Sequence, residues 1–208
     1  STQTTIIQTL ATNDDLPKDN LLQGLNRISE TVERIAKIIS GLKSISRNDS
    51  ADKKVQSINE ITHMTLAFCK ERIRHLDIEL RLSLPEEISC LCNSTQVSQV
   101  LINLLNNSID AIADQKVKWI DISLERKNNQ FCISIMDSGP GMSEESAKKI
   151  FNPFFTTKDA GKGTGLGLSI SQGLISDHGG HLSYDSKSQY TKFDILLPCH
   201  NRKAISVA

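Results

Sequence analysis

The sequence has few aromatic residues, no excess of charge of either sign and no long apolar run. Only 4% of residues are aromatic, although the hydrophobic share of 38% is enough for a globular core. Lys plus Arg and Asp plus Glu are equal at 24 each, which argues against a nucleic-acid partner or an anionic membrane surface. No apolar stretch approaches the roughly 20 residues of a membrane helix, and no signal peptide is recognisable. We expect one large domain, or a domain with an appendage, in the cytoplasm.

Cysteine is also scarce, and its positions do not suggest a metal site. The five cysteines form an odd set without metal-ligand spacing. Cys90 and Cys92 lie two apart in an apolar stretch, so both should face the same side of a strand. We expect reduced, buried core residues rather than a zinc pair, which agrees with a cytoplasmic location.

Near the start, apolar residues alternate in steps of four and three. They form a heptad seam of Leu21, Leu25, Ile28, Val32, Ile35, Ile39 and Leu42. A seam sustained over about three heptads favours packing of helix on helix between chains, although one amphipathic helix packed on its own domain is the alternative. A turn at 13–17 makes residues 2–11 the end of an earlier antiparallel helix. The predicted domains are therefore a helical hairpin, 1–48, and a second domain, 49–208.

The second domain mixes helices and strands. Helices are predicted at 57–75, 94–115 (N-capped by Asn93 or Ser94) and 166–178, with a short one after Ser143. Alternating patterns predict strands at 78–84 and 88–92 and hairpins formed by 119–126 with 131–137 and by 181–186 with 191–198. Runs of strands with helices grouped between them indicate an α+β fold, a two-layer sandwich.

The stretch "GKGTGLGLSIS" (161–171) is rich in glycine and runs directly into an apolar helix. It is no Walker loop, because Lys162 is followed by Gly163, and it is no dinucleotide fingerprint, because no strand precedes it. Glycines permit close backbone approach, and free N–H groups at a helix start bind anionic oxygens. We interpret the stretch as a phosphate site; a flexible linker is the weaker alternative.

Three other stretches carry side chains suited to a nucleotide. "NLLNN" (103–107) places Asn103 and Asn107 on one helical face, where an amide oxygen could bind Mg²⁺. "MDSGPGM" (136–142) ends a strand in Asp137, which could accept a proton from a purine amine. "FNPFFTTK" (151–158) has the composition of a hinge and packing anchor for a lid.

Together these motifs resemble the ATP-binding catalytic domain of sensor histidine kinases, within the wider gyrase, Hsp90 and MutL-like (GHKL) ATPases. The resemblance covers residues 52–198, where "QVLINLLNNSIDA", "DSGPGM", "FNPFFTTK" and "GTGLGLSI" are similar to the N, G1, F and G2 boxes. "RIAKIISGLKSISR" (34–47) resembles the second helix of the family's dimerisation hairpin. The resemblance implies a Bergerat ATP-binding fold, a mixed sheet covered by helices, preceded by a hairpin that dimerises.

It also implies roles for individual residues. Asn107 would bind Mg²⁺, Asn103 would lie beside the phosphates, and Asp137 would read the adenine amine. The remaining ATP-binding residues would be Asp110, Gly139, Gly141, Thr157, Lys158, Lys162, Gly163, Thr164, Gly165, Leu166, Gly167, Leu168 and Thr191.

The sequence departs from the family pattern at three places. Asp110 stands where many members have Lys or Arg, and Tyr190 replaces the glycine before the late threonine. None of His63, His75, His178, His181 and His200 lies in the family's phosphoacceptor motif. Because the chain begins with Ser1, we expect it to be a fragment that starts a few residues after the acceptor histidine.

The resemblance implies a protein-histidine kinase that uses ATP and Mg²⁺, forms a homodimer and passes its phosphoryl group to a response-regulator receiver domain. Any membrane attachment is expected only through sensor segments outside this chain. The alternatives are a silent nucleotide-binding scaffold, for lack of the histidine, and a gyrase or MutL-type ATPase, which would have a glutamate in place of Asn103. A serine kinase of the anti-sigma type would not need the heptad hairpin.

Overall fold

The computed structural model describes residues 24–25, 28, 53–85, 87–158 and 163–200. The chain forms two compact units, Ser1–Lys43 and Ser44–Ala208. In the first unit Gly24, Leu25 and Ile28 are helical, as the heptad pattern predicts for these positions. The rest of the seam, the preceding helix and the predicted boundary after residue 48 lie outside the described residues.

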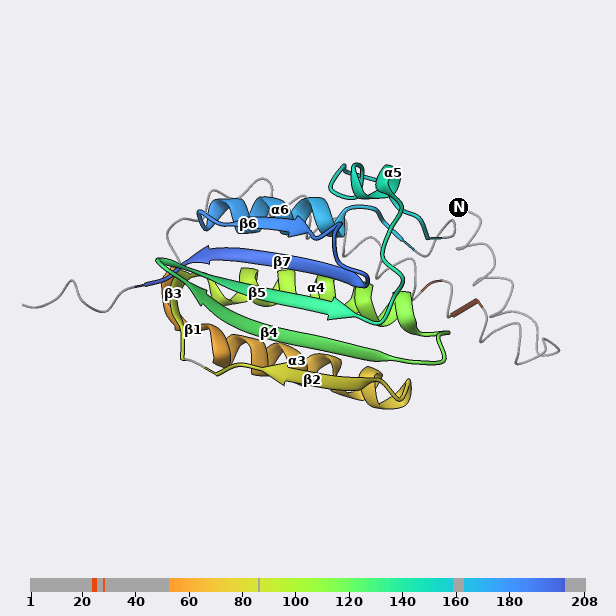
Figure 1. Ribbon diagram of the computed structural model, residues 1–208, viewed down its shortest axis with the longest axis horizontal. Helices are drawn as coiled ribbons and strands as arrows, with labels where there is room; N and C mark the ends of the chain where they lie inside the picture. The colour runs from red at the N-terminus through yellow and green to blue at the C-terminus, as the bar shows by residue number, and fades with distance from the viewer. Residues whose placement is uncertain (1–23, 26–27, 29–52, 86, 159–162, 201–208) are drawn as a thin grey trace, which may run out of the picture. The chain divides into compact units, whose positions relative to one another are not determined.

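The second unit is a two-layer α+β sandwich, as predicted. Its five-stranded sheet has the order β2-β4-β5-β7-β6 (Figure 1). The strands are β2 (Glu79–Ser83), β4 (Trp119–Lys127), β5 (Gln130–Asp137), β6 (His181–Tyr184) and β7 (Thr191–Pro198). The sheet is mixed, because β2 pairs parallel with β4 while the other pairs are antiparallel.

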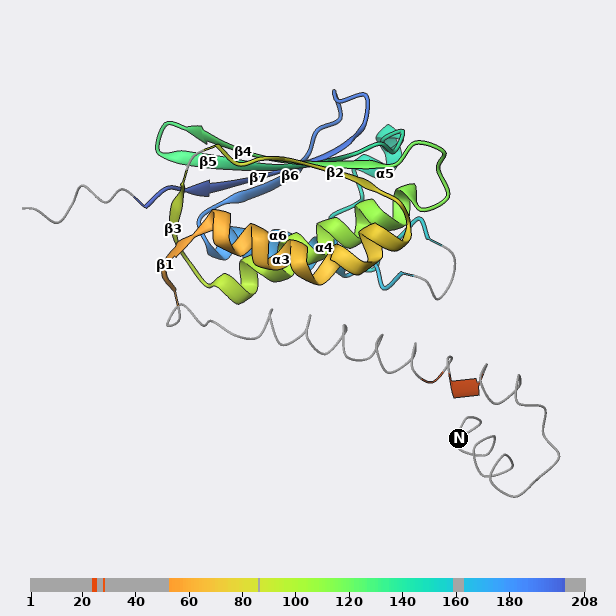
Figure 2. The same ribbon diagram turned by 90° about the horizontal axis from the view of Figure 1, so that it is seen from below.

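One face of this sheet is covered by helices (Figure 2). They are α3 (Ile58–His75), α4 (Ser94–Ile112) and α6 (Gly167–Asp177), and the short helix α5 is Glu144–Ala147. Asn93 caps α4 by accepting a hydrogen bond from the Gln96 N–H, and Ser143 caps α5 through Ser146. Helix α4 contacts both neighbouring helices and strands β4 and β5, so it is the central element of the helical layer.

The core lies between the two layers. Alternate residues of the central strands point toward the helices and are buried, among them Ile120, Ile122, Phe131, Ile133, Ile135, Phe193 and Ile195. They face the apolar stripe of α4, which includes Val97, Leu101, Leu104, Leu105 and Ile109. Each such side chain contributes about 1.5–3 kcal/mol by leaving water. This packing makes the ends of β5 and α4 a rigid frame for polar groups.

A second, two-stranded sheet pairs β1 (Lys54–Ser57) with β3 (Ser89–Cys92). Cys90 and Cys92 are buried on one face of β3 and are free thiols, as predicted. Strand β1 was not predicted, because its four residues show too little alternation to be distinguished from a loop. The predicted helix 94–115 is shorter than expected and ends at Ile112.

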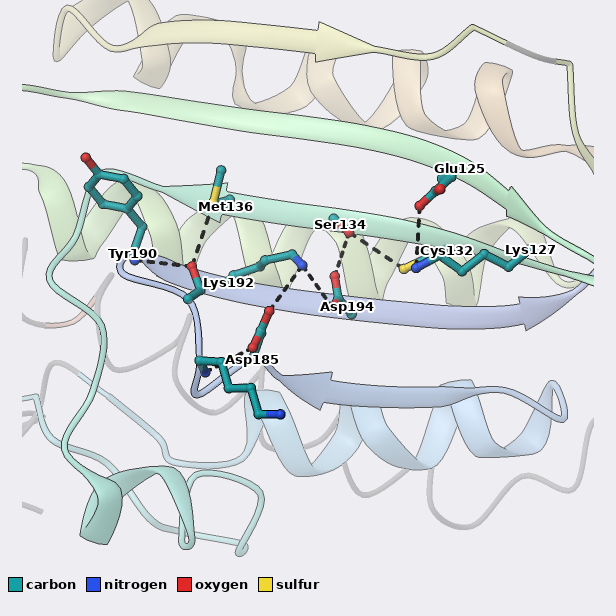
Figure 3. A network of polar contacts seen from close by, with 11 residues as sticks. Glu125, Lys127, Cys132, Ser134, Met136, Asp185, Tyr190, Lys192 and Asp194 are labelled. Carbon is teal, nitrogen blue, oxygen red and sulfur yellow. Dashed lines mark hydrogen bonds and ion pairs between the residues drawn. The ribbon is translucent and has the colours of Figure 1, made fainter.

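The other face of the five-stranded sheet is polar (Figure 3). The Lys192 ammonium lies 3.3 Å from carboxylate oxygens of both Asp185 and Asp194, and the Ser134 hydroxyl donates to Asp194 over 2.5 Å. On β7, Lys192 and Asp194 alternate with the buried residues Phe193 and Ile195. The sheet is therefore apolar toward the helices and polar on its open side.

No helix among the described residues combines the length and the apolarity that crossing a bilayer requires.

Candidate functional site

Asp137 is a buried carboxylate at the end of β5. Its side chain is almost fully covered, and it accepts a hydrogen bond from the Gly139 N–H over 2.9 Å. The hydroxyls of Ser108 on α4 and Thr191 on β7 also donate to it. Burial, the largest influence, raises the pKa of the Asp137 carboxyl, while the three hydrogen bonds act in the opposite direction. Such a fixed acceptor is suited to an exocyclic amine.

The turn after Asp137 is packed closely around it. A Cβ added to Gly139 would lie 2.6 Å from an Asp137 carboxylate oxygen and 2.9 Å from the Thr191 hydroxyl, so no side chain fits there. The Gly139 carbonyl accepts from the Thr191 N–H over 3.2 Å. Thr191, which is distant in sequence from Asp137 and Gly139, thus lies beside them in one cluster.

Tyr184 of β6 holds the far end of the same turn. Its hydroxyl accepts a hydrogen bond from the Met142 N–H over 2.9 Å, next to Gly141, whose φ is +77°. The Tyr184 ring packs on Phe193, with centroids 5.5 Å apart. Sequence reasoning missed Tyr184, because nothing in its local pattern distinguishes it from an ordinary strand aromatic.

Tyr190 does not obstruct this cluster, although it replaces a glycine of the family pattern. Its ring meets the Trp119 ring edge-on with centroids 4.9 Å apart, and the Arg81 guanidinium covers the same indole. The Thr191 side chain instead forms a hydrogen bond with Asp137. Thr191 therefore keeps its place beside Asp137.

Helix α4 presents Asn103, Asn107 and Asp110 at spacings of four and three, on one face. The Asn103 amide nitrogen donates to the Ser171 hydroxyl of α6 over 3.0 Å. Asn107 is half-buried, and its side chain makes no hydrogen bond within the described part of the chain. Its amide oxygen is a hard, neutral ligand, which fits Mg²⁺ that is shared with phosphate oxygens.

The first turn of α6 lies directly against Asn103. A Cβ added to Gly167 would come within 2.3 Å of the Asn103 amide oxygen. The N-cap residue, Leu166, provides no side-chain hydrogen bond, so the first N–H groups of α6 are left for another acceptor. Leu168, the second residue of the helix, is half-buried. Uncapped N–H groups beside Asn103 are suited to phosphate oxygens.

The glycine-rich loop before α6 packs on the segment 154–156. Gly165 has φ of +66°, and a Cβ there would lie 2.3 Å from the Phe154 carbonyl carbon. A Cβ on Gly163 would lie 2.5 Å from the Thr156 hydroxyl oxygen. In the same loop, the Leu166 N–H donates a hydrogen bond to the Thr164 hydroxyl over 3.4 Å. Residues 154–156 and 163–165, which lie on either side of the stretch 157–162 in the sequence, therefore pack closely against each other.

The expected packing role of the aromatics before the lid is wrong for Phe154. Its side chain is 75% exposed and its φ is +67°. Because Gly165 contacts the Phe154 carbonyl group, it is the backbone rather than the ring that packs here. Thr157 is exposed as well. Lys162 lies outside the described residues.

Asp110 binds two cations. One carboxylate oxygen accepts from the Lys158 ammonium over 2.5 Å, and the other forms an ion pair with Arg72 of α3. Partial burial by itself raises the pKa of the Asp110 carboxyl, but the hydrogen bonds and charges of Lys158 and Arg72 outweigh it and hold that pKa below its usual value. Asp110 and Lys158 are thus brought together, although they are not arranged as separate phosphate ligands.

Ser108 and Arg72 were also missed. Ser108 had a usable signal, because it is a polar residue on the apolar stripe of α4, between buried Leu105 and Ile109. A polar residue at such a position commonly serves a buried partner, here Asp137. Arg72 had no usable signal in the sequence, since it lies on an exposed helix face among other charged residues.

Comparison with known proteins identifies the family of this chain. Residues 92–201 match the model of the family "Histidine kinase-, DNA gyrase B-, and HSP90-like ATPase". The C4-dicarboxylate transport sensor protein DctB of Rhizobium meliloti is 30% identical over 84% of this chain and 28% of its own length. Sensor protein FixL of Bradyrhizobium diazoefficiens is 30% identical over 91% of this chain and 38% of its own length. The chain thus spans well under half of these curated relatives.

Solved structures give the same result. The nucleotide-free catalytic domain of histidine kinase ThkA superimposes with a TM-score of 0.63 at 33% identity, covering 70% of this chain and 95% of that one. ThkA in complex with the response regulator TrrA matches with a TM-score of 0.75 at 27% identity, over 97% of this chain and 57% of that one. The chain belongs to the family of histidine kinase-, DNA gyrase B- and HSP90-like ATPases, and its second unit is similar in fold to the catalytic domain of a histidine kinase.

Proposed function

We propose that this core binds ATP with Mg²⁺ and transfers the γ-phosphoryl group to a histidine of a dimerisation helix. From there the group would pass to an aspartate of a response-regulator receiver domain. One observation carries the proposal: a single site joins the buried acceptor Asp137 to a face of α4 that ends at the uncapped start of α6. The first suits adenine and the second suits phosphates.

Each end of this site has its own task. Asp137 accepts the adenine amine proton, and Gly139 and Gly141 let the base lie close to the backbone. At the other end, Asn103 and the N–H groups of Gly167 and Leu168 contact phosphate oxygens, while Lys158 and Lys162 reach them from the lid. Mg²⁺, held by Asn107, would neutralise charge on the phosphates. The core then acts by positioning and charge stabilisation.

Transfer to a histidine fits this site better than hydrolysis does. An ATPase of the gyrase or MutL type needs a general base that activates water, and Asn103 cannot accept a proton. Its amide is instead bonded to Ser171. With no base at that position, the nucleophile must be an external group that is already reactive, and a neutral imidazole nitrogen meets this requirement.

The partners follow from the same assignment. ThkA was solved with the response regulator TrrA and aligns over nearly the whole of this chain, which supports a receiver domain as the phosphoryl acceptor here. The heptad seam, 21–42, supports a homodimer, because two such hairpins form a four-helix bundle.

Labelling with γ-labelled ATP and Mg²⁺ tests the proposal. A longer form, in which a dimerisation helix with a phosphoacceptor histidine is placed before Ser1, should acquire acid-labile label, as a phosphohistidine would. Replacing that histidine by Gln should abolish the label and leave ATP affinity unchanged. The 208-residue chain alone should bind ATP and remain unlabelled.

Two results would contradict the proposal. Tight ATP binding without label in the longer form would favour the silent scaffold. Rapid release of inorganic phosphate without a phosphoprotein would favour a hydrolytic ATPase.

A further inference from the structure

Arg72 connects α3 to the phosphate-facing side of α4. Its guanidinium donates one hydrogen bond to the Asn106 amide oxygen, over 2.7 Å, and a second to an Asp110 carboxylate oxygen. Asn106 and Asp110 are four residues apart and lie on either side of Asn107 in the sequence. The guanidinium therefore sits beside the α4 turn that carries Asn107.

The same carboxylate also binds Lys158, which comes from the segment that leads into the lid. Asp110 and Lys158 each remain 35% exposed and Arg72 remains 46% exposed, so all three can be reached from solvent. Two cations held by one carboxylate leave a net positive charge at this edge of the site.

A purely structural role explains this arrangement poorly. Ion pairs at this exposure contribute little to stability, because water and salt screen them. A carboxylate on the same helix face as Asn107 would also repel bound phosphates unless cations accompany it. Both observations make sense if the cations are the functional groups and Asp110 keeps them in place.

We propose that Arg72 is a phosphate-binding residue of this site and that Asp110 holds Arg72 and Lys158 ready until ATP arrives. The forked guanidinium pairs equally well with carboxylate and phosphate oxygens, so it can exchange one for the other without losing charge-assisted hydrogen bonds. The exchange frees Lys158 as well. This inference rests on the proposed ATP site and adds a residue from α3 to it.

Calorimetry on the full 208-residue chain provides the test, with ATP and adenosine as ligands in the presence of Mg²⁺. Arg72→Gln should raise the Kd for ATP by about 10- to 100-fold, the range expected for one lost charge-assisted hydrogen bond, and leave the Kd for adenosine within about twofold. Arg72→Lys keeps the charge but not the fork and should fall between wild type and Arg72→Gln. The salt dependence of ATP binding should also decrease in Arg72→Gln.

Arg74→Gln is the matched control, because Arg74 lies on the same helix and pairs with Glu71 at the surface. It should change neither Kd. If Arg72→Gln binds ATP as wild type does, or weakens adenosine as much as ATP, Arg72 has no phosphate role and the inference is overturned. Failure of the wild-type chain to bind ATP would instead contradict the proposed function itself.

Discussion

The two ends of the proposed nucleotide site are built on different physical principles. At the adenine end, Asp137, Gly139 and Thr191 are held by hydrogen bonds inside the sheet frame, and both side chains are buried. At the phosphate end, Asp110, Lys158 and Arg72 are partly exposed and held by ion pairs. The first end is preorganised for one base. The second can rearrange when phosphate groups bind. Recognition of the base and rearrangement around the phosphates therefore occur at different ends of the site.

Removal of the adenine acceptor should have the largest effect on nucleotide affinity. Asp137→Asn keeps the shape but replaces the ionised acceptor by an amide. A hydrogen bond to a charged group contributes about 1.5–3 kcal/mol, so the Kd should rise about 10- to 100-fold for both ATP and adenosine. Calorimetry with the two ligands checks this.

Asp194→Asn is the control for that variant. Asp194 lies on the open face of the sheet, where it accepts from Ser134. Its replacement should leave both affinities unchanged. If Asp137→Asn bound adenosine with the same affinity as wild type, Asp137 would not be the adenine acceptor.

A change at the lid hinge should affect the phosphate end alone. Gly165→Ala places a Cβ 2.3 Å from the Phe154 carbonyl carbon at a φ of +66°. Strain of about 1–3 kcal/mol should weaken ATP binding by roughly tenfold and leave adenosine binding and the proposed dimer intact. Light scattering measures the association state and calorimetry the affinities.

Gly173→Ala provides the matched substitution, because a Cβ at Gly173 in α6 meets no atom within 4 Å. That variant should bind ATP as wild type does. An unchanged ATP affinity in Gly165→Ala would remove the glycine-rich loop from the phosphate site.

A smaller effect is expected from the tyrosine that supports the adenine end. Tyr184→Phe removes the acceptor of the Met142 N–H. One neutral hydrogen bond contributes about 0.5–1.5 kcal/mol, so both Kd values should rise about 2- to 10-fold. Tyr190→Phe, on the open face, should have no effect. If Tyr184→Phe weakened the binding of ATP but not of adenosine, Tyr184 would not support the adenine end.

The smallest difference should appear in the pH dependence of stability, with opposite signs at the two ends. The Asp110 pKa is lowered in the folded state, so its contribution is present above the unfolded value of about 3.9 and is lost as pH falls through the folded pKa. The Asp137 pKa is raised, so its contribution is present below about 3.9 and is lost as pH rises through the folded pKa.

Thermal unfolding of Asp110→Asn and Asp137→Asn between about pH 2 and 7 measures this contrast. Relative to wild type, the first variant should lose stability as pH rises and the second should gain it, by a few degrees in Tm. Parallel curves would show that the two carboxylates share one environment.

The sequence was sufficient to predict most of the adenine end but little of the support at the phosphate end. Asp137 could be found because a strand that ends in Asp and then turns on glycines is a local pattern. The contact between Arg72 and Asp110 joins residues 38 positions apart on separate helices. On pattern alone Arg72 is equivalent to Arg74, and only the packing of α3 against α4 distinguishes them.

The fold shows the same limit. Alternation predicted the hairpins of β4 with β5 and of β6 with β7, because half-buried strands show their two faces in the sequence. It missed β1, whose pairing with β3 depends on tertiary contact. Strand β2 is also more exposed than its alternation suggested, and Leu82 is 44% exposed because β2 lies at the edge of the sheet.

The backbone contact between Phe154 and Gly165 also limits which residue can stand before α6. A Cβ on Gly165 would lie 2.3 Å from the Phe154 carbonyl carbon, and Gly165 has a φ of +66°. Both the space and the backbone conformation therefore exclude a side chain without strain. The N-cap residue Leu166 provides no side-chain hydrogen bond to the helix. The position where α6 begins thus depends on the absence of a side chain at Gly165 rather than on the presence of a capping side chain.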